Sequence, residues 1–357
     1  MSRISVCAIV KNEEKTIERM LESVQPYGFE IVVVDTGSTD GTKEIVSRYT
    51  DKIHDFEWCD DFSAARNFAA ARASNDWILM MDADEWIESL DLEELRYFMK
   101  KYPDCLGSVF MDNETGTPDR KGPVSRIHIE RFYNRRKFHY ISPIHEMLAP
   151  RHKGVLFENL QLNSVLGHSG YCMDEETRKK KAERNIGLLL KQLSDDPSEE
   201  DIPYILYQLG KGYQMTGDDE EACARFGKAL EYDLDPELDY VNDLVVQYGN
   251  ELLLLKRYEE ALSFEGIREA FEKTADFVYL MGRIYLVNEK YQQAADEFQK
   301  ALTIRNYRLE GTNSYLPAFE LGKLLLKANQ PGNARVFLKM CGNYPPAVKL
   351  LNETGRE

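Results

Sequence analysis

The chain has 357 residues, a length that predicts two or three domains at roughly 100–200 residues per domain. Hydrophobic residues make up 43% of the sequence and charged residues 30%, a composition that argues against disorder and collagen-like repetition. The formal net charge is −16, from 45 Lys and Arg against 61 Asp and Glu, which argues against a nucleic-acid partner because polyphosphates select basic surfaces.

The cysteines and the apolar segments predict the compartment. Six cysteines lie far apart and form no Cys-x-x-Cys pair, so we expect reduced thiols rather than a disulfide framework or a zinc knuckle. The apolar run at residues 4–10 is too short for the hydrophobic region of a secretory signal. No stretch approaches the roughly 20 apolar residues of a membrane span. We therefore expect a cytoplasmic protein without a membrane span.

The first 90 residues alternate between strand and helix patterns. Compact apolar runs predict buried strands at residues 4–10, 30–35 and 77–81, and residues 52–56 are a candidate for a further strand. Helical periodicity separates them at residues 17–24, 45–46 and 62–73. This alternation predicts βαβ units and a parallel sheet. Ligands of such sheets bind beyond the carboxyl ends of the strands, where Asp35 and Asp82 stand.

The pattern changes from residue 105 to about residue 170. Residues 124–134, 138–149 and 155–167 look extended, and we expect them to complete a mixed sheet with antiparallel strands. Within this region, residues 120–137 hold a basic cluster opposed only by Glu130: Arg120, Lys121, Arg126, Arg131, Arg135, Arg136 and Lys137. The cluster is either a solvated strand face or a contact for a phosphate or an acidic acceptor.

The C-terminal part contains a repeat. Four glycines, each followed twelve residues later by an alanine, occur at positions 210, 249, 282 and 322. The pattern resembles tetratricopeptide (TPR) repeats, pairs of antiparallel helices of about 34 residues. We expect a first domain over residues 1–172, a linking helix over 173–202, TPR-like repeats over 203–345 and a C-terminal tail over 346–357. Three roles stay open for the repeats: peptide binding, a purely structural solenoid, or formation of a homodimer.

Four polar segments of the N-terminal part belong together. They follow the first, second and last predicted strands or open a helix, at Lys11–Glu14, Asp35–Thr42, Met81–Glu85 and Asp61–Asn67. In order, spacing and placement they resemble the inverting family-2 glycosyltransferases of the GT-A fold, over about residues 4–90. Strand alternation leads us to expect Asp82 and Asp84 on the same side of an extended segment. Carboxylate oxygens suit a divalent cation that neutralises a departing diphosphate.

The resemblance assigns roles to these segments. It implies a UDP-sugar donor and a divalent metal, Mg²⁺ or Mn²⁺. Asp84 is then a metal ligand, and Asp82 contacts the ribose of the donor, the metal or its bound water. Asp35 accepts the uracil N–H, although many relatives carry a second Asp where Thr36 stands here. The remaining residues of the donor site are Asn12, Glu13, Arg66 and Asn67.

A later motif, Ile144-His145-Glu146, resembles a subgroup with attached helical repeats. That subgroup includes the S-glycosyltransferases that modify bacteriocin peptides. Inversion needs a base on the acceptor side, and either Glu146 or His145 is the candidate. His168, which precedes Ser-Gly-Tyr, is the candidate for a third metal position. Each histidine could instead be structural.

We therefore expect an α/β GT-A domain followed by an all-α TPR-like domain. The resemblance implies transfer of a glucose or N-acetylglucosamine type of sugar to a Cys or Ser/Thr side chain of a peptide or protein, with the acceptor contacting the TPR domain. Two alternatives stay open. One is a cell-surface glycan or lipid-linked acceptor, and the other is a catalytically inactive TPR scaffold.

Overall fold

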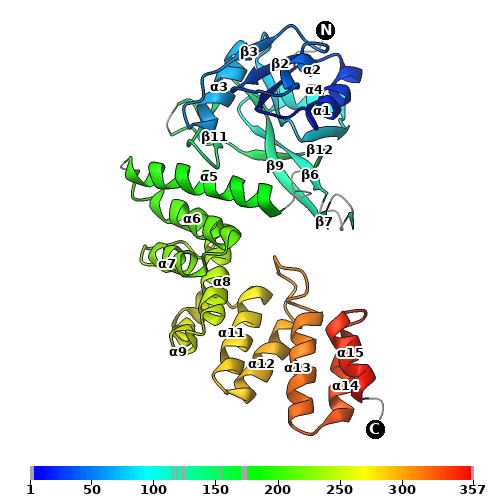
Figure 1. Cartoon of the computed structure of the whole chain (residues 1–357), viewed down its shortest axis with the longest axis vertical. Helices are drawn as coiled ribbons and strands as arrows, with labels where there is room; N and C mark the ends of the chain where they lie inside the picture. The colour runs from blue at the N-terminus through cyan, green and yellow to red at the C-terminus, as the bar shows by residue number, and fades with distance from the viewer. Residues whose placement is uncertain are drawn as a thin grey trace. The chain divides into compact units, whose positions relative to one another are not determined.

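The computed structural model describes residues 4–114, 116–117, 120–121, 125–152, 154–169, 175–195 and 197–354. The chain divides into two compact units, one ending at Leu188 and the other beginning at Leu189 (Figure 1). Within the described residues, every helix is too short or too polar to cross a membrane.

The described part of the first unit is built on one eight-stranded mixed sheet, which confirms the predicted α/β class. Its strand order is β3-β2-β1-β4-β9-β6-β12-β5. The parallel half consists of β1 (Ile4–Val10), β2 (Glu30–Asp35), β3 (Ile53–Asp55) and β4 (Trp77–Asp82). The other half contains β6 (Leu106–Asn113), β12 (Asn159–His168) and β5 (Glu85–Ser89). Strand β9 (Ser125–Asn134) lies between β4 and β6 and runs antiparallel to both.

Helices cover both faces of the sheet, and strand alternation decides which side chains meet which helix. Helix α1 (Ile17–Val24) shares a buried cluster with Val6 of β1, and α4 (Leu92–Lys101) contributes to the same cluster. Helix α3 (Phe62–Arg72) packs on the opposite face, where Cys7 donates to the carbonyl oxygen of Ala69. A short helix, α2 (Thr42–Val46), follows β2. Because alanines line the buried side of α3, this helix approaches the strands closely.

Two predicted extended segments are shorter or divided in the structure. Residues 138–149 form a hairpin of β10 (Phe138–Ile141) and β11 (Met147–Pro150), and the turn between them carries Ser142 at φ 70° and His145 at φ 52°. The strand predicted at 155–167 begins only at Asn159 and ends at His168. A separate pair, β7 (Gly116–Thr117) and β8 (Arg120–Lys121), stands outside the main sheet. Pro143 and Gly154 interrupt the apolar alternation at these places because both residues favour turns.

The second unit is helical, as predicted. After α5 (Glu175–Ser194), it contains α6 (Ile202–Thr216), α7 (Asp219–Ala229), α8 (Asp239–Leu254), α9 (Tyr258–Ala261), η2 (Leu262–Ile267), α10 (Arg268–Phe271), α11 (Ala275–Val287), α12 (Tyr291–Ala301), α13 (Tyr315–Lys327), α14 (Pro331–Met340) and α15 (Pro345–Thr354). The repeat glycines mark close helix contacts, since a Cβ on Gly210 would lie 2.3 Å from the ring of Phe226. The segment predicted as a tail forms α15, because Ala347 is buried against Leu338 of α14.

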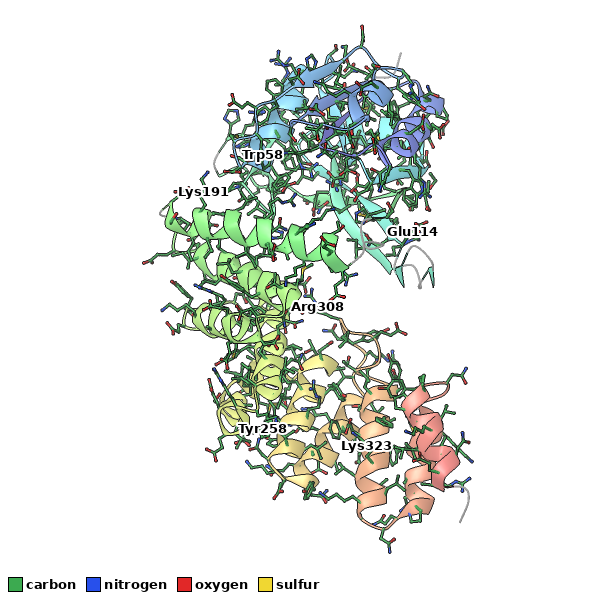
Figure 2. The ribbon with its side chains drawn as sticks, viewed as in Figure 1. Trp58, Glu114, Lys191, Tyr258, Arg308 and Lys323 are labelled. Carbon is green, nitrogen blue, oxygen red and sulfur yellow. The ribbon has the colours of Figure 1, made fainter. Side chains whose placement is uncertain are left out.

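The longest spacing between repeat glycines, from Gly282 to Gly322, contains a loop that folds back onto earlier helices. Both carboxylate oxygens of Asp276 accept backbone N–H groups of this loop, from Arg308 at 2.9 Å and from Leu309 at 2.8 Å. Arg308, labelled in Figure 2, donates to the carbonyl oxygen of Asp239 at 2.6 Å. The additional residues of this repeat therefore pack against α8 and α11.

Candidate active site

A cavity of about 340 Å³ lies beyond the carboxyl ends of β1, β2 and β4. It collects side chains from the four motif segments, from the loop before α3 and from later elements: Lys11, Glu13, Thr36, Trp58, Phe62, Arg66, Asp82, Asp84, His145, Glu146, His168, Lys181, Arg184 and Asn185. A larger cavity of about 960 Å³ opens at the amino ends of the same strands, and its lining includes Ile4 and Trp77 but none of the predicted site residues. The smaller cavity is therefore the candidate active site, and we call it the motif cavity.

Five charged side chains form a continuous chain beside the motif cavity. Asp82 accepts at one oxygen from Arg66 and at the other from Arg131, both at 2.8 Å. Arg66 also donates from Nε to Glu146 at 2.6 Å, and Arg131 pairs with Glu85. Both arginine side chains are only 7% exposed. The network thus fixes the orientation of Asp82 through two guanidinium groups.

The charges of this network shift pKa values in opposite directions. Burial opposes the ionised form of Asp82, but Arg66 and Arg131 outweigh it and hold the pKa of Asp82 below its usual range. Glu85 is 1% exposed, and burial raises its pKa to about 7 despite the attraction of Arg131. Asp82, which has two arginine partners, therefore stays ionised, whereas the pKa of Glu85, which has one, is raised to about 7.

Asp84 lies in the turn that follows Asp82 and faces a histidine. Residues 83 and 84 form a turn between β4 and β5, so the expectation of an extended segment through Asp82 and Asp84 is wrong. The Oδ2 atom of Asp84 lies 3.5 Å from Nε2 of His168. Strand β12 places His168 between Glu85 of β5 and Asn113 of β6 in the sheet register.

The imidazole of His168 is oriented by a buried amide. Its Nδ1 donates to Oδ1 of Asn113 at 2.8 Å, and Asn113 is 2% exposed. Burial disfavours the imidazolium, but the hydrogen bond and the charge of Asp84 outweigh it and raise the pKa of His168. Because Nδ1 carries a hydrogen, Nε2 faces Asp84 either with a second proton or with its lone pair. In the second case a cation between the two groups would satisfy both.

Asp35 is buried at the end of β2 with one unsatisfied oxygen. Its Oδ1 accepts the backbone N–H groups of Gly37 and Ser38, each at 2.9 Å. The Oδ2 atom is buried and has no hydrogen-bond partner in the described part of the chain. A buried carboxylate oxygen without a donor is costly, so this position favours a ligand that brings one.

Three other predicted residues make structural contacts. Asn12, at φ 57°, accepts from the backbone N–H of Thr39 at 2.8 Å and so joins the loops that follow β1 and β2. The side chain of Asn67 is bonded at both ends to the backbone of Tyr140, at 2.8 and 2.9 Å. Like Asp35, neither Asn12 nor Asn67 lines the motif cavity, whereas Glu13 does. Burial, opposed by a hydrogen bond from Thr16 and assisted by Asp84, raises the pKa of Glu13.

The two candidate bases lie on the turn of the β10–β11 hairpin. The backbone N–H of Phe62 donates to the carbonyl oxygen of Pro143 at 2.8 Å, which joins this turn to the start of α3. His145 and Glu146 both line the motif cavity, and Glu146 is paired with Arg66. A non-glycine residue at positive φ is uncommon, so His145 is held in its conformation by the surrounding structure.

Sequence reasoning missed three cationic residues of this site. The sequence places Arg131 in the basic cluster of residues 120–137, yet it is buried against Asp82 and Glu85. Lys181 and Arg184 belong to α5, which the sequence indicates only as a linking helix, and both line the motif cavity. The guanidinium of Arg184 lies 5.2 Å from the ring of Phe62. Their spacing of three residues along one helix face was the available signal.

Comparisons with known proteins agree with this arrangement. Residues 5–162 match the family model described as glycosyl transferase family 2. A TPR repeat-containing protein of Synechococcus elongatus is 33% identical over 225 residues, which cover 61% of this chain and 54% of the relative. The SPbeta prophage-derived glycosyltransferase SunS of Bacillus subtilis is 28% identical over 309 residues, which cover 84% of this chain and 71% of that protein.

The solved structures show only loose similarity. The crystal structure of S. aureus TarS covers 76% of this chain and 55% of its own, at 15% identity and a TM-score of 0.37. The chain spans about half the length of the cyanobacterial relative. With the family model over residues 5–162 and the mixed sheet in view, the N-terminal unit of this chain is a glycosyltransferase domain of family 2, and it precedes a TPR-like helical unit.

Proposed function

We propose that the motif cavity binds a UDP-sugar together with Mg²⁺ or Mn²⁺ and transfers the sugar to a peptide or protein side chain with inversion. The observation that carries this proposal is the pairing of Asp84 with His168 at 3.5 Å, beside an Asp82 already held by two arginines. Glycosyl transfer needs positive charge where the diphosphate departs, and the cavity gathers carboxylate, imidazole and cationic groups at one place.

The residues fit a divalent cation. Mg²⁺ is usually bound through one or two carboxylates plus phosphate oxygens and water rather than by a full protein cage. Across the described residues, no three His, Cys, Asp or Glu side chains are grouped closely enough to hold an ion by themselves. Asp84 and His168 would hold the cation, and Asn113 would orient His168. Asp82 suits the ribose or a metal-bound water, because both of its oxygens already accept from arginines. When bound, the cation would supply positive charge to the diphosphate.

The remaining donor contacts follow from charge and unsatisfied groups. The buried Oδ2 of Asp35 suits the uracil N–H. Lys181 and Arg184 line the cavity and suit the diphosphate oxygens, for which Arg offers a forked donor and Lys a point charge. Glu13 lines the same cavity, close enough to Asp84 and Lys181 to interact with both charges.

The acceptor side is assigned to the β10–β11 turn. Glu146 or His145 takes the proton of the attacking hydroxyl or thiol. Glu146 is held toward the cavity by Arg66, which keeps its carboxylate beside Asp82. We assign the acceptor to a peptide or protein because the chain carries a TPR-like unit, a class of repeat that presents extended binding surfaces. The first alternative is a glycan or lipid-linked acceptor. The second alternative is a catalytically inactive scaffold.

Release of UDP from mixed UDP-sugars, with and without a small peptide acceptor, tests the proposal. The wild-type chain should release UDP in Mn²⁺ or Mg²⁺ and should add the mass of one hexose or N-acetylhexosamine to an acceptor. The Asp84→Asn variant should lose activity by orders of magnitude, because charge stabilisation by a metal is worth several kcal/mol. Asp51→Asn, at an exposed aspartate of the same unit, is the matched control. Equal turnover by the Asp84→Asn variant, or activity that survives EDTA, rules out the metal site; no UDP release under any condition favours the inactive scaffold.

A further inference from the structure

A separate cavity of the N-terminal unit is lined mostly by arginines. It has a volume of about 340 Å³ and is lined by Ala70, Ala71, Arg135, Arg136 and Arg151. We call it the arginine cavity. It shares no residue with the motif cavity: Phe62 and Arg66 of α3 line the latter, whereas Ala70 and Ala71 stand near the other end of the same helix. At 1.5 Å per residue, Phe62 and Ala71 are separated by roughly 13 Å along the helix axis.

Two of the three guanidinium groups, those of Arg135 and Arg136, share one carboxylate in the described part of the chain. The Nε of Arg136 pairs with Asp76 at 2.8 Å, and Nη2 of Arg135 lies 3.7 Å from the same oxygen. The Nε of Arg151 donates to the carbonyl oxygen of Arg135 at 2.8 Å, which brings these two residues together without neutralising either. The lining therefore carries two positive charges more than negative ones, counting Asp76.

Arg135 is fixed in place rather than free to turn outward. Its side chain is 16% exposed, and its Nη1 donates to the carbonyl oxygens of Ala70 at 2.9 Å and Ala71 at 3.3 Å. Its Nε is buried without a hydrogen-bond partner among the described residues. Holding like charges around one cavity costs free energy, which an anion between them would offset.

An exposed apolar loop adjoins the arginine cavity. The backbone N–H of Arg151 donates to the carbonyl oxygen of Lys137 at 2.8 Å at the base of the β10–β11 hairpin. Phe157 packs on Phe138 of that hairpin with ring centroids 5.4 Å apart. Next to it, Leu156 is 96% exposed and Val155 is 46% exposed. The hairpin that Arg151 follows therefore also packs against this exposed apolar loop.

We propose that the arginine cavity binds a phosphate group, as a phosphate monoester or diester. Guanidinium forks bind phosphate oxygens with paired hydrogen bonds, and an excess of two positive charges matches a phosphate better than a single carboxylate. A soluble phosphate compound and a phospholipid headgroup share this chemistry. In the second case the loop with Val155 and Leu156 would enter the lipid interface beside the headgroup.

Calorimetry of the full chain with inorganic phosphate, without added metal, is the first arm. Arg151→Gln and, as a second variant, Arg136→Gln should each weaken phosphate binding about tenfold or more. Arg335→Gln, at an exposed arginine of α14, should bind as wild type does. Wild-type phosphate affinity in both cavity variants, or no phosphate binding by the wild-type chain at millimolar concentration, overturns the proposal.

Sedimentation with vesicles distinguishes the two sources of phosphate. Vesicles of phosphatidylglycerol and phosphatidylcholine are compared with vesicles of phosphatidylcholine alone. If a lipid headgroup is the ligand, the chain sediments with the anionic vesicles only. Arg151→Gln and Leu156→Asp then each abolish sedimentation. Leu156→Asp still binds inorganic phosphate in the calorimeter. If the ligand is soluble, no vesicle sediments the chain and the calorimetric effect of Arg151→Gln stands alone. Val336→Asp, at an exposed valine of α14, is the control for a new surface charge.

Discussion

The Oδ1 atom of Asp82 lies 2.8 Å from Nη2 of Arg66, although the two residues come from different elements, β4 and α3. Arg66 is also bound to Glu146 of the β10–β11 turn. One buried guanidinium thus joins the end of a central strand to the candidate base. The position of Glu146 relative to the donor site therefore depends on Arg66.

Removal of this guanidinium should destabilise the first unit. Arg66→Gln leaves Asp82 and Glu146 without their shared partner, and breaking a buried pair by deleting one member costs about 3 kcal/mol or more. Urea unfolding of the full chain, followed through the transition of the first unit, measures the loss. Arg72→Gln, on an exposed residue of the same helix, should change the unfolding free energy by less than about 0.5 kcal/mol. Equal losses in the two variants would show that the contact of Arg66 with Asp82 is energetically neutral.

The amide of Asn113 should control metal affinity through His168. Asn113→Leu removes the oxygen that accepts from Nδ1, so the imidazole loses its fixed orientation. Outer partners of this kind are typically worth 10–100-fold in metal affinity. We expect the Mn²⁺ concentration for half-maximal UDP release to rise about that much. Asn113→Asp keeps an acceptor and should retain most of the affinity. An unchanged Mn²⁺ dependence in Asn113→Leu would mean that His168 is not a metal ligand.

The two candidate bases can be separated by the acceptor they serve. Glu146→Gln keeps an oxygen that can accept from Arg66 but cannot take a proton. Binding of UDP, measured by calorimetry, should stay near wild type, while transfer to a hydroxyl should fall about 10²–10⁴-fold. Transfer to a thiol should suffer less and should recover partly as the pH rises, since a cysteine with a pKa near 8.5 supplies some thiolate.

His145→Gln is the matched variant for that experiment. A large fall in hydroxyl transfer by His145→Gln, with Glu146→Gln near wild type, assigns the base to His145. Loss of UDP binding in Glu146→Gln would place Glu146 in the donor site. Wild-type rates in both variants would exclude the whole β10–β11 turn from proton transfer.

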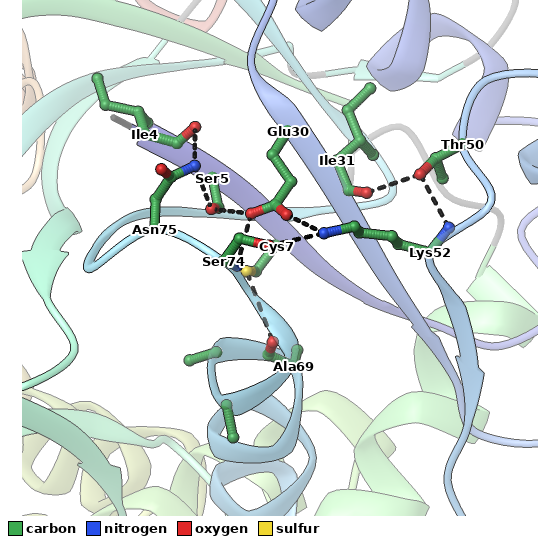
Figure 3. Close-up of polar contacts among 12 residues, drawn as sticks. Ile4, Ser5, Cys7, Glu30, Ile31, Thr50, Lys52, Ala69, Ser74 and Asn75 are labelled. Carbon is green, nitrogen blue, oxygen red and sulfur yellow. Dashed lines mark hydrogen bonds and ion pairs between the residues drawn. The ribbon is translucent and has the colours of Figure 1, made fainter. Parts of the chain in front are cut away.

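A partly buried carboxylate at the other end of the strands from the motif cavity should give the first unit a pH-dependent stability. Figure 3 shows Glu30 between Ser5, Lys52 and Ser74, and the backbone N–H of Ser74 donates to it at 2.8 Å. Burial disfavours the carboxylate, but these hydrogen bonds outweigh it and lower the pKa of Glu30 to about 2. The folded-state pKa lies below the ordinary value of 4.5, so the contribution is complete above about pH 4.5 and is lost as the pH falls toward 2.

Glu30→Gln should therefore lower the unfolding free energy of the first unit by roughly 2–3 kcal/mol at pH 7. The difference from wild type should shrink steadily below pH 4.5, as measured by urea unfolding at a series of pH values. Glu18→Gln, at a side chain that is 49% exposed, is the control and should show little change. A difference that stays constant down to pH 3 would assign the effect to shape rather than charge.

The sequence by itself determined the elements whose patterns are local. The runs that became β1, β2 and β4 are apolar enough to be buried on both sides, and the face of α1 repeats with the period of a helix. The spacing of glycine and alanine in the second unit also identified its repeats. This pattern is local because Gly210 and Phe226 meet within one helix pair. The carboxyl ends of parallel strands share one edge, so Asp35 and Asp82 could be placed together as well.

Only the tertiary structure decided which charges meet at the site. Arg131 lies 49 positions from Asp82 and Glu146 lies 80 positions from Arg66, and no local period relates such residues. Arg131 and Arg135 stand in one basic stretch, yet β9 buries the first beside Asp82 while the turn that follows directs the second toward the arginine cavity. Packing of helix α5 likewise brings Lys181 and Arg184 to the motif cavity, far along the chain from its other lining residues. Pairing over such separations depends on strand order and helix packing, which the folded chain fixes as a whole.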